Sequence, residues 1–481
     1  PFLRQPPAVP ILHCSVAAMR PVLQVLLALQ AAGSLAKPIS RTGTGFFEPW
    51  LEQKLEAIRR SPSSSSLGLR VTRGLGSKGY GKVRISVVAP KLKDFQDFNF
   101  TYRRQFQYRW TENFLHSSLL DVTPGSHRVS IGGQQVTIDL PAEDVGIRGV
   151  LISDPCISSK WIHCAYADKF QTPARTPKML NAAFADDSMN FLAILGDNFY
   201  DQTGELNNVI FSQLSLDVKR RFLMVVNGNH DNWVCGSNHC GGPADNYGHG
   251  QMQYYAQDTV ASTLPPQDDV NFLSFAVNPD HRKDWHAFQN DATNFLAYQK
   301  LGNLGFLTFS GAGSLRDSEP HFQAACDYFA RAKPAAVFLM GHWNTEGLGC
   351  EKDMAVPEVR EELMKIPSCA AFGERLKYMD GHEHCNYVQT TGRTPYGFMI
   401  GAHGMDDRCK PQYGFLYADS TNSRVSLHYF EVASEEKGDR FDEILGCVQR
   451  KGGLHACTSL ADTWLDEPIS GARGESTVIS V

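Results

Sequence analysis

The chain has 481 residues, of which 42% are hydrophobic and 20% are charged, a composition that can bury a core and excludes global disorder. The 46 Lys and Arg against 51 Asp and Glu give a formal net charge of −5, without the basic domain of a nucleic-acid binder, so we expect no nucleic-acid partner. No apolar run reaches the roughly 18 residues of a membrane-spanning helix, and we expect none in the mature chain.

The N-terminal segment has the parts of a secretory leader. Met19 and Arg20 precede an apolar stretch over residues 22–32, and small residues follow up to Ala36. A positive start, an apolar centre and a small-residue end are typical of a signal peptide; a buried helix is the alternative. We expect residues 1–36 to be an upstream segment followed by a signal peptide over residues 19–36. The protein is then secreted, or resides in an endomembrane or vacuolar lumen.

The cysteines favour an oxidising compartment. Of the 12 cysteines, Cys14 would be lost with the leader, and most of the others form close sequence pairs: 156/164, 235/240, 350/369, 385/409 and 447/457. Disulfides are therefore expected, although spacing leaves their connectivity open. Cys326 lies between Phe322 and Phe329 at helical spacing and is expected to be a buried, unreactive thiol. The sequon Asn99-Phe100-Thr101 is compatible with a secreted glycoprotein.

The region up to residue 142 is expected to contain a linker and a small β module. An amphipathic helix is predicted over residues 49–60, and the serine-rich stretch over 61–66 completes a helix-and-linker segment spanning 37–67. Residues 68–142 show the alternation of β-strands and form the predicted module. Within it, residues 127–131 and 134–140 flank Gly132-Gly133, the signature of a tight hairpin.

From about residue 147, short apolar strands alternate with helices. Strand-like segments cover residues 149–153, 191–195, 222–226, 335–340 and 375–380. Helices are expected over 181–187 and 320–331, the latter with Ser318 and Pro320 at its start. This alternation predicts an α/β domain with buried, largely parallel strands over residues 147–457. Residues 458–481 are expected to form a polar, mobile tail.

Polar residues follow each of the five strand-like segments. The blocks are Asp154, Gly196-Asp197-Asn198-Phe199-Tyr200, Asn227-Gly228-Asn229-His230-Asp231, Gly341-His342 and Gly381-His382-Glu383-His384. In an α/β domain the carboxyl ends of the strands share one edge, where ligands bind. Any single block fits a common turn or a structural histidine. Five blocks at the same end of a strand favour one shared site.

The residue types in these blocks predict a pair of metal ions. Seven side chains are candidate ligands: Asp154, Asp197, Tyr200, Asn229, His342, His382 and His384. Two carboxylates, a phenol, an amide oxygen and three imidazoles are too many for one zinc site. They suit two cations about 3.5–4 Å apart, the arrangement that hydrolyses phosphate esters.

In this order, the blocks resemble those of the calcineurin-like metallophosphoesterases. Tyr200 and the Gly341-His342 block resemble the purple acid phosphatases within that superfamily. The resemblance covers roughly residues 147–430 and implies a metallophosphoesterase-type β-sandwich core flanked by helices. It also implies an enzyme that hydrolyses phosphate monoesters by attack of a metal-bound hydroxide. A phosphodiesterase on the same fold, or a non-catalytic scaffold or adhesion relative, is the alternative; a scaffold would need none of the seven ligands.

Carried over block by block, the resemblance implies two sets of three ligands and a bridge. One metal would be bound by Asp154, Tyr200 and His384. The other would be bound by Asn229, His342 and His382. Asp197 would bridge the two ions. A tyrosinate site favours Fe³⁺, whereas an amide and imidazole site suits Zn²⁺, Fe²⁺ or Mn²⁺. His230 would contact the phosphate and protonate or stabilise the leaving oxygen.

The first block departs from the superfamily pattern. The usual Asp-x-Gly is replaced here by Asp154-Pro155-Cys156. Asp144-Val145-Gly146 fits the pattern but precedes its strand, so Asp154 is the expected ligand. The missing glycine changes the loop beside the first metal, and a Cys156–Cys164 disulfide could hold that loop instead. The alternative role for Tyr200 is that of a packed aromatic beside Phe199.

Overall fold

The computed structural model describes twelve stretches of the chain, which are residues 67–73, 80–89, 93–100, 102–105, 114–159, 162–201, 205–232, 255, 296–390, 392, 394–405 and 409–469. The predicted signal peptide, the helix over residues 49–60, the serine-rich linker, and Cys235 and Cys240 lie outside these stretches. No helix in the described stretches combines the length and apolarity needed to cross a membrane.

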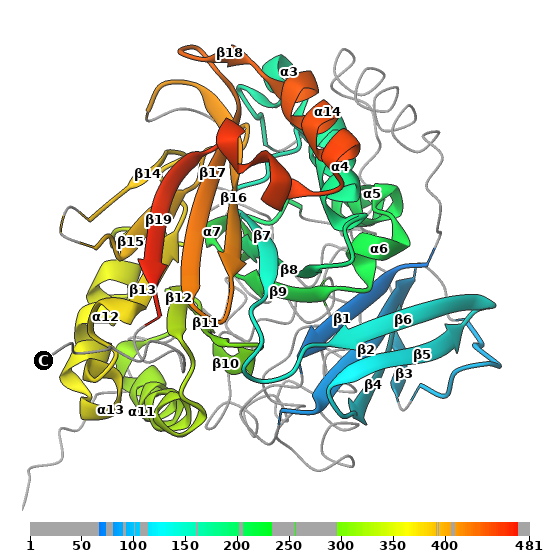
Figure 1. Cartoon of the computed structure of the whole chain (residues 1–481), viewed down its shortest axis with the longest axis horizontal. Helices are drawn as coiled ribbons and strands as arrows, with labels where there is room; N and C mark the ends of the chain where they lie inside the picture. Colours follow the sequence, from blue (N-terminus) through cyan, green and yellow to red (C-terminus); the bar gives the residue numbers. More distant parts are fainter. Residues whose placement is uncertain are drawn as a thin grey trace, which may run out of the picture. The chain divides into compact units, whose positions relative to one another are not determined.

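The larger of two packed sheets has eleven strands (Figure 1). They are β1 (Leu69–Arg73), β2 (Lys82–Ala89), β3 (Tyr102–Gln105), β4 (Phe114–Asp121), β7 (Arg148–Ile152), β8 (Met189–Leu195), β9 (Phe222–Val226), β16 (Gln412–Ser420), β17 (Arg424–Ser434), β18 (Gly438–Asp439) and β19 (Asp462–Pro468). The order is β18-β17-β16-β7-β8-β9-β1-β2-β4-β3, and β19 pairs with β17. Strands β7, β8, β9 and β1 run parallel. Of the region predicted as an N-terminal module, strands β1 to β4 therefore belong to this sheet.

The smaller sheet has six strands, most of them parallel. They are β10 (Leu296–Leu301), β11 (Leu304–Phe309), β12 (Ala336–Met340), β13 (Leu376–Asp380), β14 (Asn386–Val388) and β15 (Gly397–Ile400), in the order β10-β11-β12-β13-β15-β14. A separate hairpin joins β5 (Gly125–Ile131) to β6 (Gln134–Leu140). Gly132 and Gly133 at its turn have φ of 60° and 76°, which glycine adopts without steric cost. The predicted hairpin is confirmed.

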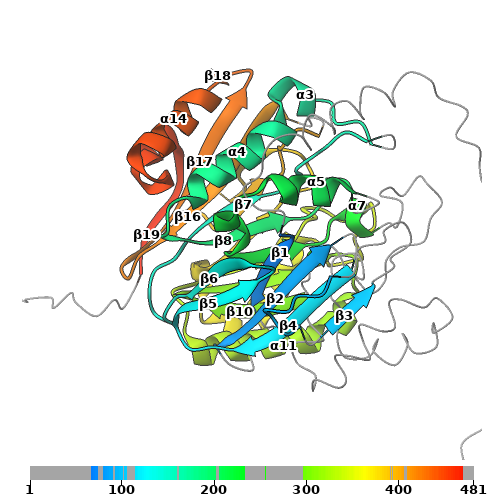
Figure 2. The ribbon, with the colours of Figure 1, turned by 90° about the vertical axis from the view of Figure 1, so that its right-hand side faces the viewer.

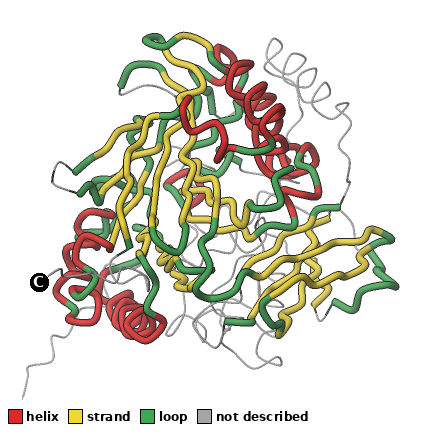
Figure 3. Tube along the Cα trace, viewed as in Figure 1, coloured by secondary structure: helices red, strands yellow, loops and turns green. Residues whose placement is uncertain are grey.

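Helices cover the outer faces of the two sheets (Figures 2 and 3). The helices are α3 (Ala167–Phe170), α4 (Thr172–Phe184), α5 (Glu205–Gln213), α6 (Leu216–Lys219), α7 (Asn229–Asn232), α11 (Leu315–Ala332), α12 (Val356–Lys365), α13 (Pro367–Ala370) and α14 (Phe441–Lys451), with the 3₁₀ turns η3 (Gly373–Arg375) and η4 (Leu454–Leu460). Helices α4 and α14 pack on the larger sheet, and α11 and α12 pack on the smaller one.

A single apolar core joins the inner faces of the two sheets. Phe191 of β8 meets Phe306 of β11 edge to face, with ring centroids 5.1 Å apart. Strands such as β9, with the sequence Phe-Leu-Met-Val-Val, are buried on both faces, as a parallel strand between a sheet and a helix layer must be. The predicted β-sandwich core flanked by helices is confirmed.

Two predicted helices have different limits in the structure. The helix expected over residues 320–331 begins at Leu315, where the Ser314 hydroxyl caps it by accepting from the Asp317 amide, so Pro320 lies inside the helix. The helix expected over residues 181–187 is the C-terminal part of α4, which begins at Thr172 and ends at Phe184. Proline is tolerated early in a helix. A proline in the sequence therefore does not mark the first residue of either helix.

The expectation of a mobile tail from residue 458 is wrong for residues 462–468, which form β19 against β17. The strand is polar because only part of it is buried. Trp464 stacks on Tyr429 with ring centroids 4.6 Å apart, and Leu465 is buried. Glu467 accepts from the buried Lys377 at 2.7 Å. Aromatic packing and an ion pair with the smaller sheet therefore hold a segment whose composition suggests disorder.

Four disulfides are present among the described residues: Cys156–Cys164, Cys326–Cys369, Cys385–Cys409 and Cys447–Cys457. Three of them join close sequence pairs. The expectation that Cys326 is a free thiol is wrong, because α11 and α13 pack together and place it beside Cys369. Cys350 is left as the free cysteine of the described residues. Burial, followed by nearby Glu346, raises the pKa of its thiol to about 12.

A buried lysine at the end of α6 is expected to make the free energy of unfolding depend on pH. Lys219 is 4% exposed, and burial, followed by repulsion from Arg70, lowers its pKa from 10.5 to about 7. Between these two pH values the unfolded chain binds more protons, so wild-type stability should rise with pH. Below about pH 7 Lys219 is charged in both the folded and the unfolded chain, so its burial destabilises the fold by the full amount. Lys219→Met should raise the free energy of unfolding at pH 7 by at least about 1 kcal/mol and flatten this rise.

Urea unfolding at pH 6, 7.5 and 9 measures both effects. The control is Lys178→Met on the exposed face of α4, which should change stability by less than about 0.5 kcal/mol at every pH. An unchanged pH slope in the Lys219→Met protein would contradict the assignment.

Candidate metal centre

The five predicted blocks follow strands that end at one edge of the two sheets. Asp154, Asp197 and Asn229 follow β7, β8 and β9 of the larger sheet. His342 and the His382–His384 block follow β12 and β13 of the smaller sheet. The structure brings all eight predicted site residues together: Asp154, Asp197, Tyr200, Asn229, His230, His342, His382 and His384.

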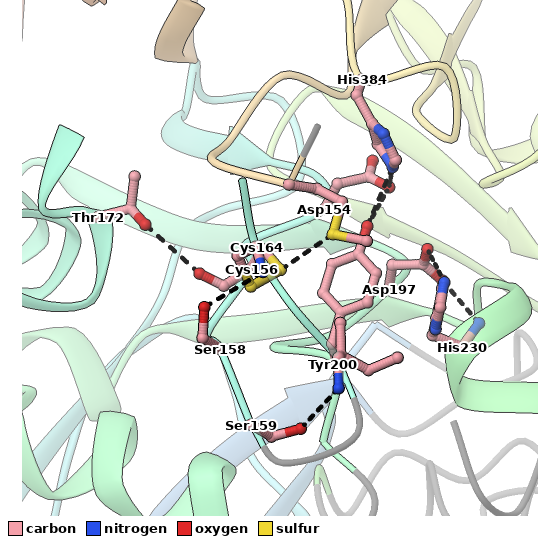
Figure 4. Close-up of a disulfide and its surroundings, with 12 residues drawn as sticks. Asp154, Cys156, Ser158, Ser159, Cys164, Thr172, Asp197, Tyr200, His230 and His384 are labelled. Atoms are coloured by element: carbon pink, nitrogen blue, oxygen red, sulfur yellow. Dashed lines mark hydrogen bonds and ion pairs between the residues drawn. A yellow bond between two sulfur atoms is a disulfide. The ribbon is translucent and has the colours of Figure 1, made fainter. Parts of the chain in front are cut away.

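The first triad is Asp154, Tyr200 and His384. The Asp154 Oδ1 atom lies 3.3 Å from the Tyr200 hydroxyl and 3.4 Å from His384 Nε2. The Tyr200 hydroxyl lies 3.0 Å from the same His384 nitrogen, and the three groups converge in Figure 4. Asp154 and Tyr200 are fully buried. Tyr200 therefore directs its hydroxyl at two other candidate ligands, and is more than a packed aromatic.

The second triad is Asn229, His342 and His382. The Asn229 Oδ1 atom lies 3.1 Å from His342 Nε2 and 2.9 Å from His382 Nδ1. The other nitrogen of His342, Nδ1, lies 2.9 Å from the Leu195 carbonyl oxygen. That carbonyl can only accept, so it fixes Nδ1 as the protonated nitrogen and leaves Nε2 toward the site, the usual orientation of a metal-ligating imidazole.

Asp197 lies between the two triads. Its Oδ1 is 3.4 Å from His342 Nε2, and its Oδ2 is 3.9 Å from His230 Nε2. Asp154, Asp197 and His342 each offer one ligand atom, and these atoms all lie within 4.8 Å of one another. Buried carboxylates are costly unless a cation or strong donors compensate them. This donor set of carboxylates, a phenol, an amide and imidazoles fits metal ions.

The backbone at the site is held in an unusual conformation. Five of the candidate ligands have a left-handed φ: Asp154 (53°), Asp197 (47°), Tyr200 (54°), His382 (71°) and His384 (54°). A non-glycine residue pays ~1–3 kcal/mol for such a conformation, and these residues concentrate where function requires them. The surrounding sheets therefore impose loop geometries that the chain would not choose locally.

Two glycines explain why the blocks pack so closely. A Cβ atom on Gly228 would collide with the Asp197 carboxylate, and one on Gly381 would collide with Ser153 and the Asp154 carboxylate. Both positions therefore require glycine because a carboxylate approaches the backbone. The glycines beside the candidate ligands are part of the site's construction.

Two supporting residues hold the carboxylate loops. Asp231 accepts from the Gly228 amide at 2.8 Å and from the Asn198 side chain at 2.9 Å, so it ties the second block to the third. Sequence reasoning did not single out Ser153, whose hydroxyl donates to Asp154 Oδ2 at 2.6 Å. Its position directly before the candidate ligand is the only signal that could have identified it.

Opposite charges set the protonation of the central groups. Burial disfavours the charged form of Asp197, but the facing His342 and His230 outweigh it and hold the pKa of this carboxyl far below its usual value. Burial also disfavours charged His342, yet Asp197 and Asp154 raise its pKa to about 9. Burial, followed by His342, lowers the pKa of His382 to about 4. A cation bound at His342 must displace a proton, so its affinity should fall at low pH.

His230 lies beside the triads and belongs to neither. Its side chain is 16% exposed, and its ring packs 4.4 Å from that of Tyr200. Its backbone amide donates to Asp197 Oδ1 at 2.8 Å. The imidazole is thus anchored next to the Asp197 carboxylate while part of it faces solvent.

Comparisons with known proteins match at the level of structure. No family model and no curated protein matches this sequence. A purple acid phosphatase from yellow lupin (Lupinus luteus) seeds is similar over 77% of this chain and 72% of its own, with 12% identity and a TM-score of 0.47. PhoD is similar over 78% and 88%, with 10% identity and a TM-score of 0.41. A predicted phosphoesterase from Streptococcus pneumoniae is similar over 60% and 90%, with 9% identity and a TM-score of 0.24.

These similarities are similarities of structure alone. At these identities and TM-scores, the likeness says nothing about the chemistry of this chain. The chemistry follows from the arrangement of its own side chains.

Proposed function

We propose that this protein is a dinuclear metal-dependent hydrolase of phosphate monoesters. The observation that carries the proposal is the meeting of two ligand triads on either side of the buried Asp197. Asp154, Tyr200 and His384 would hold one ion, and Asn229, His342 and His382 would hold the other. A site that served only as a scaffold would not require five candidate ligands in left-handed backbone conformations.

The donor sets favour different ions. Phenolate and carboxylate oxygens in the first triad favour Fe³⁺, whereas the amide and imidazoles of the second suit Zn²⁺, Fe²⁺ or Mn²⁺. Bound ions of this kind neutralise charge on a phosphate group and lower the pKa of water. Asp197 would contribute to holding both ions, because its carboxylate lies within 4.8 Å of ligand atoms of Asp154 and His342, which belong to different triads.

His230 would handle the proton of the leaving group. Its imidazole is anchored beside Asp197 and is partly exposed, so it can reach a phosphate ester that enters from solvent. A histidine in this place can donate a proton to the leaving oxygen as the phosphorus–oxygen bond breaks.

An assay on two substrates tests the proposal. Purified protein is incubated with p-nitrophenyl phosphate and with bis(p-nitrophenyl) phosphate, and its metal content is measured in parallel. Turnover of the monoester with about two ions per chain supports a monoesterase. Preference for the diester would favour a phosphodiesterase, and absence of both metal and turnover would favour the scaffold.

The Tyr200 hydroxyl predicts a coloured protein. If Tyr200 binds Fe³⁺, charge transfer from the phenolate should give the protein a violet or pink colour. Tyr200→Phe should lose this absorption band and bind the first ion more weakly, by about 10-fold or more, while the second ion is retained. Visible spectra and metal analysis measure both effects, with Tyr387→Phe on the exposed edge strand β14 as the control. A colourless, active, zinc-only wild type would exclude the iron assignment.

We also propose that the protein works outside the reducing cytosol. The four disulfides among the described residues fit an oxidising compartment, such as the extracellular space or a vacuolar lumen. Asn99 is exposed, so it would be accessible for glycosylation there.

A further inference from the structure

Two of the disulfides lie next to ligands of the same triad. Cys156 is two residues after Asp154, and Cys385 directly follows His384. The second triad has a different setting in the described residues, where the loop after His342 carries the free Cys350. Among the candidate ligands, those nearest in sequence to these two disulfides therefore belong to the first triad.

The Cys156–Cys164 disulfide also packs against the third member of the first triad. Cys156, Cys164 and Tyr200 belong to one buried cluster, completed by Ile162 and Ala167. Both cysteines are 1% exposed and Tyr200 is fully buried. In Figure 4 the disulfide lies to one side of the Tyr200 ring, whose hydroxyl points toward Asp154 and His384. The disulfide thus supports both a carboxylate loop and a phenol.

A shared loop connects the two disulfides. The Cys156 amide donates to the His403 carbonyl at 3.3 Å, and Cys156 Sγ lies 3.3 Å from Met405 Sδ. Cys385 forms a disulfide with Cys409, and the Gly401 amide donates to the Cys385 carbonyl at 2.8 Å. Residues 401–405 therefore contact both the backbone beside Asp154 and the backbone beside His384.

This bracing opposes a backbone that would otherwise relax. Asp154, Tyr200 and His384 all have left-handed φ values, and such conformations persist only where the surrounding structure imposes them. We infer that the Cys156–Cys164 and Cys385–Cys409 disulfides are positioning elements for the first triad, so that breaking either weakens metal binding there and spares the second triad. The inference rests on the proposed metal centre and assigns it a dependence on thiol redox state.

The test uses two disulfides of similar size. Cys156→Ser with Cys164→Ser removes a bridge of sequence separation 8, and Cys447→Ser with Cys457→Ser removes one of separation 10 between α14 and η4. Because loop length is nearly equal, the two losses should destabilise the chain by similar amounts in the chain-entropy description. The control therefore matches the loss of stability without touching the triad.

Each protein is stripped of metal, titrated with Fe³⁺ nitrilotriacetate and Zn²⁺, and analysed for bound metal and visible absorption. The first double variant should bind Fe³⁺ about 10–100-fold more weakly, regain the absorption band at high Fe³⁺, and bind the second ion with wild-type affinity. The control variant should match wild type for both ions. Equal Fe³⁺ affinity in all three proteins, or equal weakening in both variants, would overturn the inference.

The outcome is separable from that of the proposed function. A wild-type protein that binds no metal would overturn both the proposed function and this inference. If the wild type binds two ions and the first double variant binds them equally well, only this inference is overturned. If the first double variant does not fold, Cys385→Ser with Cys409→Ser provides the same test. Selective loss of Fe³⁺ affinity in that variant supports the inference, and unchanged affinity overturns it.

Discussion

Asp197→Asn is expected to abolish turnover of p-nitrophenyl phosphate. The carboxylate lies between the two triads and faces His342 on one side and His230 on the other. An amide keeps the shape but loses the negative charge and offers only one oxygen, so the two ions would no longer share a ligand. We expect a fall in kcat of at least about 10³-fold, equal to about 4 kcal/mol of barrier, and at most one ion retained per chain.

The control for this variant is Asp217→Asn. Asp217 is an exposed carboxylate on α6 that pairs with Arg220 at 3.1 Å, and loss of such a surface pair changes stability by less than about 1 kcal/mol. Its activity and metal content should equal those of wild type. Near-native turnover by the Asp197→Asn protein, with two ions bound, would contradict a bridging role.

His230→Ala should slow the reaction while both ions stay bound. The imidazole belongs to neither triad, so its removal takes away a proton donor and no proposed ligand. Loss of a general acid costs about 10²–10⁴-fold in rate. The loss should be small for p-nitrophenyl phosphate, whose leaving group is a weak base, and large for an alkyl phosphate, whose leaving oxygen needs the proton.

Kinetics on a series of aryl and alkyl phosphates measures this dependence. His455→Ala is the control, because His455 is a 38% exposed histidine that pairs with Asp186 away from the site. A rate loss that is the same for every leaving group would assign His230 to phosphate binding instead of proton transfer. Loss of metal from the variant would place His230 among the ligands.

The strands that carry the site are predictable because of how they are buried. Residues 191–195 of β8 are covered on both faces, so they form a continuous apolar run that is followed by Gly196 and Asp197. The carboxyl ends of parallel strands meet at one edge, which is why residues far apart in sequence could be assigned to one site. Division of the strands into two sheets depends on pairing between distant segments, such as β1 with β9, and local pattern does not specify it.

Other features were missed because tertiary contacts override local signals. The polar strand β19 is held by ion pairs and one stacked tryptophan, and Cys326 reaches Cys369 only because two helices pack together. Backbone conformation was also beyond sequence reasoning. Left-handed φ values, as at Asp154 and His384, are uncommon for non-glycine residues, and the folded loops impose them.

Each triad draws its members from both sheets. Asp154 and Tyr200 come from the larger sheet and His384 from the smaller, while Asn229 comes from the larger and His342 and His382 from the smaller. Ions held in this way would link the two sheets of the sandwich. The free energy of metal binding would then stabilise the folded protein against separation of the sheets. Loss of the metals would then weaken the packing of the two sheets against each other. A fragment containing either sheet alone could assemble neither metal site.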